Sequence, residues 1–156
     1  MTDRSVTHAT FVLEHLYPVP PARVFDAWAD AAAKTRWFAG ALDPAAAPMA
    51  MDFRVGGTER AVSHADDGQV IVYEGLFRDI VPGERIVVAN WIDVDGQRIS
   101  VSQFTAEFQA YGNGTRLVVT EQGAYLDGHD SPDSRAIGIR AQLAALAAEL
   151  DTGWTT

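Results

Sequence analysis

The segment SPDSRAIGIRAQLAALAAEL, residues 131–150, decides the fold of this chain. Ser131 and Pro132 predict a helix start, because serine caps the first turn and proline fits the first helical position. Gly153 is suited to end the helix. A long amphipathic helix must pack its apolar face against another layer, so the preceding residues have to supply that layer. The apolar face consists of residues spaced by four, three and four positions, namely Ile139, Leu143, Leu146 and Leu150.

The residues before this helix predict an antiparallel sheet. Residues 8–17 (HATFVLEHLY) are rich in aromatic and branched residues, as strands are. From residue 51, beginning with MDFRV, about six strand-like segments follow one another across short turns. Gly75 lies inside one of these segments and indicates a bulge or a close backbone approach. The turns contain Gly56-Gly57, Asp66-Asp67-Gly68, Pro82-Gly83, Asp95-Gly96 and Asn113-Gly114.

Two short helices are expected between the first strand and the others. Pro21 begins the first, PARVFDAWAD, and Asp30 caps the second, AAAKTRWF, which Gly40 ends. The resulting order is β-α-α-β-β-β-β-β-β-α. It predicts an α+β fold in which a curved antiparallel sheet wraps around the long C-terminal helix, with a cavity between them. We expect one domain over residues 1–156, with its core at about residues 8–151.

Composition narrows the classes of partner. The chain has 156 residues with 12 Lys and Arg against 21 Asp and Glu, a net charge of −9, and its basic residues are scattered. Nucleic acids and anionic membrane surfaces are therefore not expected partners. The absence of cysteine excludes disulfides, thiolate nucleophiles and cysteine-bound zinc. No apolar run is long enough to span a membrane, and MTDRSVTHAT has no signal-like apolar region, so a cytoplasmic location is expected.

Aromatic residues are the main candidates for ligand contacts. They are spread over the helices and strands expected to face the cavity, where they either line an apolar pocket or simply fill the core. Trp28 is the one most expected to be pure core, whereas Trp37, Phe38 and Trp91 are the preferred lining residues. The expected ligand-binding residues are Trp37, Phe38, Phe53, Tyr73, Phe77, Trp91, Gln103, Phe104, Glu121, Ile139 and Leu143.

Glu121 is the candidate for acid–base chemistry. It shares a strand face with Leu117 and Val119, because side chains two positions apart point the same way. If that face is inward, burial raises the pKa of Glu121 and suits it to donate or accept a proton. Two other interpretations stay open: an ion pair with an arginine such as Arg54, or a solvent-facing strand end. Asn90 and Gln103 are further strand-interior polar residues suited to hydrogen-bond a ligand.

Other kinds of site have little support. The histidines (His8, His15, His64 and His129) do not form a metal-ligand pattern, and the loop Asp127–Asp130 is better explained as a turn with capping carboxylates. The chain has no G-x-S-x-G nucleophile motif. Gly56-Gly57 joins strands and lacks the Lys-Ser/Thr pair of a phosphate-binding loop. No metal and no cofactor are expected.

Seven short strings are spread over most of the chain, namely PARVFDAWA (21–29), TRWF (35–38), DFRVGG (52–57), YEG (73–75), IVPGERI (80–86), GTRLVVTEQG (114–123) and LDGH (126–129). In this order and spacing they make the chain resemble the SRPBCC (START-like, helix-grip) superfamily. Within it, the chain looks like the branch related to the C-terminal domain of the Aha-type chaperone-ATPase activator. One position departs from the resemblance, because relatives often carry tryptophan after the glycine of the last helix and here Ile139 follows Gly138.

The resemblance implies a fold more than a function. The superfamily includes lipid carriers, plant hormone and allergen proteins, polyketide cyclases and aromatases, resistance proteins and co-chaperones, and a fold does not choose among them. The leading hypothesis is a protein that binds a small hydrophobic or aromatic molecule. The alternatives are a cyclase/aromatase-like enzyme using Glu121, and a protein-interaction, co-chaperone-like domain. A homodimer through the sheet also stays open.

Overall fold

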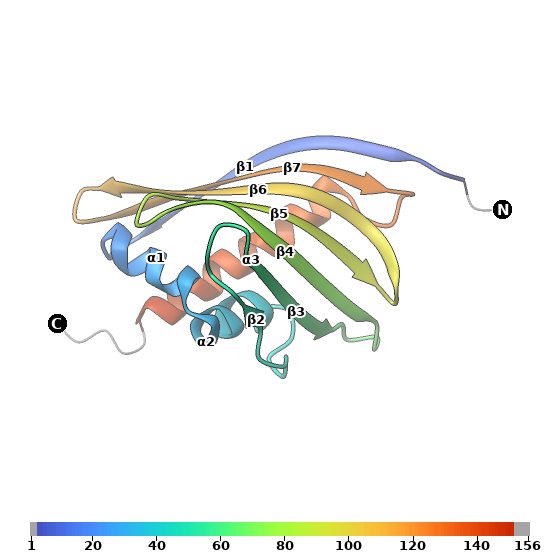
Figure 1. Ribbon diagram of the computed structural model, residues 1–156, viewed down its shortest axis with the longest axis horizontal. Coiled ribbons are helices and arrows are strands. Elements are labelled where there is room, and N and C mark those ends of the chain that lie inside the picture. The colour runs from blue at the N-terminus through green and yellow to red at the C-terminus, as the bar shows by residue number, and fades with distance from the viewer. Residues whose placement is uncertain (1–2, 152–156) are drawn as a thin grey trace.

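A seven-stranded antiparallel sheet curves around one long helix (Figure 1). The computed structural model describes residues 3–151 of the chain. Strands β2 to β7 form a meander, and β1 pairs with β7, which gives the order β1-β7-β6-β5-β4-β3-β2. The fold is therefore the predicted α+β helix-grip architecture. The strands are β1 (Val6–Tyr17), β2 (Ala50–Met51), β3 (Thr58–His64), β4 (Val70–Val81), β5 (Arg85–Val94), β6 (Gln97–Tyr111) and β7 (Gly114–Leu126).

The helices lie under the concave face of the sheet, where α1 and α2 flank the long helix α3 (Figure 1). Asp30 caps α2 as predicted, because its carboxylate accepts a hydrogen bond from the N–H of Ala32. The expected single helix AAAKTRWF is instead divided, since a π-helical turn follows α2 and ends at Ala39, with Gly40 as its C-cap. The helical elements are α1 (Pro21–Ala29), α2 (Ala31–Lys34), the π-helical turn η1 (Thr35–Ala39) and α3 (Pro132–Asp151).

Helix α3 packs as its sequence pattern predicts. The N–H of Ser134 donates to Oγ of Ser131 over 3.1 Å, so Ser131 is the predicted cap. The four stripe residues are buried in one core cluster with the inward side chains of β6 and β7, among them Phe108, Leu117 and Val119. The expected helix end at Gly153 lies outside the described residues.

Two expectations about the strands need correction. Residues MDFRV do not form a strand of their own, because β2 ends at Met51. The chain then turns back so tightly that a Cβ on Gly57 would lie 2.0 Å from the carbonyl oxygen of Asp52. At Gly75 the close approach is by side chains, among them Tyr73, and not by backbone, while the register shift of β4 falls between Phe77 and Asp79.

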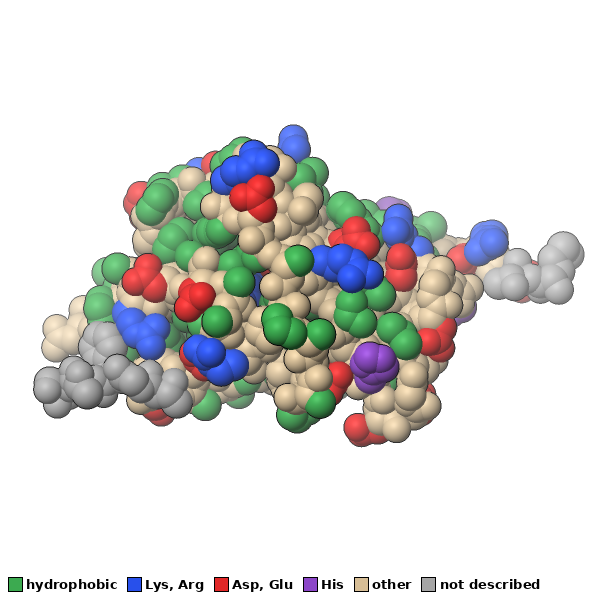
Figure 2. All heavy atoms as spheres, turned by 60° about the horizontal axis from the view of Figure 1, so that its bottom comes forward, with side chains coloured by type: hydrophobic (Ala, Val, Ile, Leu, Met, Phe, Trp, Pro, Cys, Tyr) green, Lys and Arg blue, Asp and Glu red, His purple; other side chains and the backbone are tan. Residues whose placement is uncertain are grey.

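The outer surface on the helical side mixes both signs of charge. In Figure 2 acidic and basic side chains are interspersed with apolar ones over the visible face. No helix within residues 3–151 is long and apolar enough to cross a membrane.

Candidate functional site: an internal cavity under the sheet

A cavity of about 260 Å³ lies between the concave face of the sheet and the helices α3 and η1. Its wall is largely apolar, with a few polar groups from the sheet and from the start of α3, which is the usual composition of a small-molecule site. The lining residues are Trp28, Lys34, Phe38, Leu42, Ile71, Tyr73, Val88, Asn90, Ile92, Val94, Ile99, Phe104, Glu121, Asp130, Ser134, Arg135, Gly138, Ile139 and Gln142.

The register of the sheet places a row of small and polar residues beside the cavity. One inward-facing row crosses five strands as Glu59, Gly75, Asn90, Ser102 and Gly123. Its members are small or polar, whereas the next row toward the core carries large apolar side chains from β4, β5 and β6. Asn90 is the member of this row that lines the cavity.

Two tyrosines lie over the two glycines of this row. The hydroxyl of Tyr73 is 2.9 Å from the position a Cβ would take on Gly75, and the hydroxyl of Tyr125 is 2.9 Å from the same position on Gly123. Any larger residue at either glycine would displace its tyrosine. The two hydroxyls differ in their partners, because Tyr125 donates to Oε2 of Glu121 over 3.2 Å.

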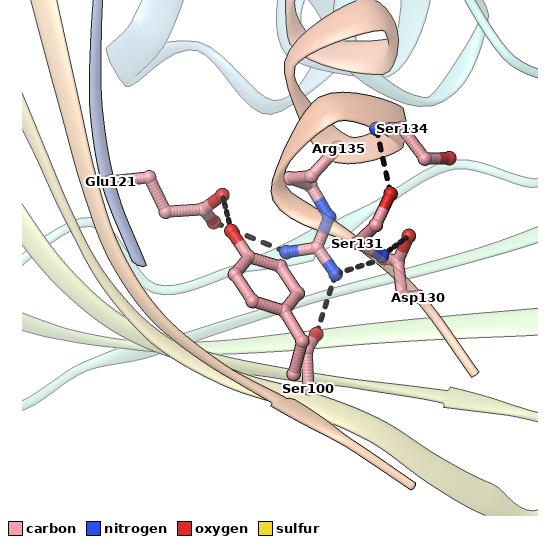
Figure 3. Close-up of polar contacts among 7 residues, drawn as sticks. Ser100, Glu121, Asp130, Ser131, Ser134 and Arg135 are labelled. Carbon is pink, nitrogen blue, oxygen red and sulfur yellow. Dashed lines mark hydrogen bonds and ion pairs between the residues drawn. The ribbon is translucent and has the colours of Figure 1, made fainter. Parts of the chain in front are cut away.

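A polar network closes one end of the cavity (Figure 3). Arg135, in the first turn of α3, donates from Nη1 to Oε1 of Glu121 over 3.1 Å. Its Nη2 donates to Oδ2 of Asp130 over 2.8 Å and to Oγ of Ser100 over 2.5 Å. One guanidinium therefore joins β6, β7 and the start of α3.

The electrostatics of Glu121 combine burial with these contacts. Burial raises the pKa of Glu121 above its ordinary value, while Arg135 and the hydroxyl of Tyr125 act in the opposite direction. Burial and the neighbouring Glu121 carboxylate also raise the pKa of Tyr125. Glu121 shares its strand face with Leu117 and Val119 as predicted, that face is buried, and the arginine partner of Glu121 is Arg135. The suggested Arg54 pairs with Asp52 instead.

A second ion pair borders the cavity and is almost fully buried. Nζ of Lys34 donates to the two carboxylate oxygens of Glu59 over 2.6 and 3.0 Å, and the side chains are 3% and 0% exposed. Nζ also lies 5.2 Å from the ring centroid of Trp28 and 5.1 Å from that of Phe38, within the range of cation–π attraction.

The structure places five of the eleven expected ligand-binding residues on the cavity wall, together with Asn90. They come from η1, three strands and α3, so the fold brings together residues far apart in the sequence. The five are Phe38, Tyr73, Phe104, Glu121 and Ile139.

Four of the other expected residues lie in the core beside the cavity: Trp37, Phe53, Phe77 and Leu143. Trp37 is the clearest correction, because its Nε1 donates to the carbonyl of Ala27 over 2.9 Å and its ring is buried. Trp28, expected to be pure core, reaches the cavity wall instead.

Trp91 and Gln103 lie on the outer face of the sheet. Asn90 and Ile92 both line the cavity, so Trp91 between them points outward, where its ring is 5.9 Å from the guanidinium of Arg98. Gln103 donates to Gln122 on the neighbouring strand over 3.0 Å.

Four charged residues in or beside the cavity wall were not predicted from the sequence: Lys34, Glu59, Asp130 and Arg135. A signal was present for Glu59, which alternates with Ala61 and Ser63 along an inward strand face. Nothing local indicated that Lys34, within an alanine-rich turn, meets Glu59. Over residues 3–151, no group of three or more His, Asp or Glu side chains is placed to hold a metal ion.

Comparison with known proteins supports this architecture. The family model described as Activator of Hsp90 ATPase homolog 1-like protein matches residues 18–151. The chain belongs to this family. No curated protein matches the chain. Among solved structures, the chain is similar to a putative uncharacterized protein of Rhizobium leguminosarum. The two are 40% identical with a TM-score of 0.88, over 96% of this chain and 99% of the other.

Two further solved structures share this fold. A Rhizobium loti protein is 44% identical with a TM-score of 0.85, over 93% of this chain and 99% of the other. A Chromobacterium violaceum protein is 26% identical with a TM-score of 0.75, over 91% of this chain and 96% of the other. The likeness establishes family and fold, so a ligand has to be argued from the cavity itself.

Proposed function

We propose that the protein binds a small apolar or aromatic molecule in the cavity under the sheet. The support is an apolar wall with a few placed polar groups around a volume of about 260 Å³. A cavity of about 150 Å³ is enough for benzene, so this volume suits about one or two aromatic rings. A sterol, with its larger fused ring system, exceeds it.

The observation that carries the proposal is Gly138. This glycine lies in the interior of α3 and on the cavity wall, and a Cβ built there would meet no atom within 4 Å. Glycine inside a helix costs about 0.5–1 kcal/mol relative to alanine. No close packing at this position requires the glycine, whereas a ligand would make use of the space that it leaves.

A cavity-filling variant tests the proposal. Toluene, p-cresol, indole and 2-naphthol would be titrated into the ¹⁵N-labelled protein and followed by NMR. We expect at least one to shift amide signals of cavity residues in a saturable manner. Gly138→Phe should abolish this binding, because the new ring projects into the cavity. Ile137→Phe is the matched control, since Ile137 neighbours Gly138 but is 67% exposed.

Two results would count against the proposal. One is the absence of saturable shifts with every compound of the panel. The other is a Gly138→Phe variant that is folded, as judged by its own amide spectrum, and binds as the wild type does.

A second candidate function is an acid–base reaction on the bound molecule, of the cyclase/aromatase kind. The observation that favours it is the raised pKa of Glu121 at the cavity wall. If a bound compound is converted, Glu121→Gln should remove turnover while leaving binding in place, and full turnover by this variant would exclude the role. The co-chaperone-like alternative rests on family likeness alone.

A further inference from the structure

We propose that the cavity is selective for a neutral aromatic molecule carrying a hydroxyl or carbonyl group, which hydrogen-bonds to the side chains of Tyr73 and Asn90. The inference rests on the proposed function and specifies the ligand class of the same cavity. A phenol is the simplest member of this class.

The first observation is that both side chains lack hydrogen-bond partners among the described residues. Asn90 is only 3% exposed and lines the cavity with Tyr73. Among residues 3–151, neither the amide of Asn90 nor the hydroxyl of Tyr73 has a hydrogen-bond partner. Neither group belongs to the fully buried unpaired atoms of the described residues, so both open onto the cavity, where a bound molecule can supply the missing partner.

The second observation is that the two groups lie at one place. Asn90 is the register partner of Gly75 on the neighbouring strand, and the hydroxyl of Tyr73 lies over Gly75. The hydroxyl of Tyr73 therefore occupies the space that a side chain of Gly75 would take, next to Asn90 in the register. The two groups form one polar subsite, which offers both donors and acceptors to a single hydroxyl or carbonyl.

Tyr125 is a comparable tyrosine whose hydroxyl has a hydrogen-bond partner within the protein. It has the same relation to Gly123 as Tyr73 has to Gly75, but its hydroxyl is satisfied by Glu121 within the protein. Of the two tyrosines that lie over glycines of this row, Tyr125 has its partner built in and Tyr73 does not. Because the second of these faces the cavity, the ligand is the natural source of that partner.

The charges around the cavity favour a neutral ligand. Each of the two cations in its wall is already paired, Lys34 with Glu59 and Arg135 with both Glu121 and Asp130. A carboxylate ligand would find no unpaired cation there and would meet the repulsion of three carboxylates. Burying such a charge without a partner is strongly unfavourable.

The test compares two molecules of nearly the same shape, p-cresol and p-xylene, by isothermal titration calorimetry. We expect the wild type to bind p-cresol more tightly by about tenfold, the usual effect of one buried hydrogen bond. Tyr73→Phe should remove most of this preference while p-xylene binds as before. Asn90→Leu is the second variant, and Tyr111→Phe is the matched control, because Tyr111 is 59% exposed and outside the cavity.

The outcomes separate the two proposals. If neither molecule binds, the proposed function fails, and this inference with it. If both bind with equal affinity, or if the preference for p-cresol persists in both variants, a ligand site exists but the polar subsite is wrong. Binding of 4-methylbenzoate as tightly as p-cresol would overturn the selectivity for neutral molecules.

Discussion

The buried pair of Lys34 and Glu59 permits a quantitative prediction. Replacing Glu59 by Leu leaves the Lys34 ammonium in a site where its side chain is 3% exposed and its remaining neighbours are aromatic rings. Breaking a buried ion pair by removing one partner costs about 3–5 kcal/mol. For a chain of this size, each kcal/mol lowers Tm by about 2–4 °C, so a decrease of about 6–20 °C is expected.

The double variant Lys34→Met with Glu59→Leu should recover most of this loss. It removes both charges, and replacing a buried pair by apolar side chains of similar volume is often neutral or stabilising. Urea unfolding followed by circular dichroism would give the free energy of unfolding of the wild type, the two single variants and the double variant. These four values define the coupling energy between the residues.

An exposed pair provides the control for this cycle. Arg60 and Glu74 approach to 3.7 Å on the surface, and removing either should cost less than about 1 kcal/mol. The reasoning about Lys34 and Glu59 would be refuted if each single variant lost less than about 1 kcal/mol, the range of exposed pairs. It would equally be refuted if the double variant lost the sum of the two single effects.

Three further predictions concern β7 and α3. Because the pKa of Glu121 is raised above its ordinary value of 4.5, its stabilising contribution is complete below that value and declines as pH rises through the raised value. In urea unfolding, the free energy of unfolding of Glu121→Gln minus that of the wild type should therefore increase from about pH 4 to about pH 8. A difference that stays constant with pH would contradict this reasoning. Ser131→Ala removes the cap of α3 and should cost about 1 kcal/mol, whereas Ser131→Gly should cost only a few tenths, as measured by thermal unfolding. Gly138→Ala should stabilise the protein by about 0.5–1 kcal/mol, and a loss of stability would show that the space at this position is not free.

The fold was predictable because its main signals are periodic. The stripe of α3 and the alternation of Leu117, Val119 and Glu121 each indicate a buried face without reference to any distant residue. Register and turn chemistry then determine which strands are neighbours. Where tight backbone turns replace regular structure, as after Met51, the same periodic pattern gave a strand that the chain does not form.

The site was less predictable because it depends on which face of a strand each side chain takes and on ion pairs between residues far apart in the sequence. Trp91 looked like a lining residue by its chemistry, but a shift of one position along a strand changes the face, and Asn90 faces the cavity instead. The pairs of Lys34 with Glu59 and of Arg135 with Glu121 join different elements. Nothing in the local sequence indicates which cation meets which carboxylate, since only tertiary packing brings them together.

The open space at Gly138 makes the size of the cavity adjustable. Because this position belongs to α3, a series of substitutions to Ala, Val, Leu and Phe would shorten the cavity in steps while the sheet and its register stayed as they are. A single codon therefore sets how much space the cavity offers. Two chains with superimposable backbones can differ in this space, which is why a shared architecture does not by itself carry a shared ligand from one protein to another.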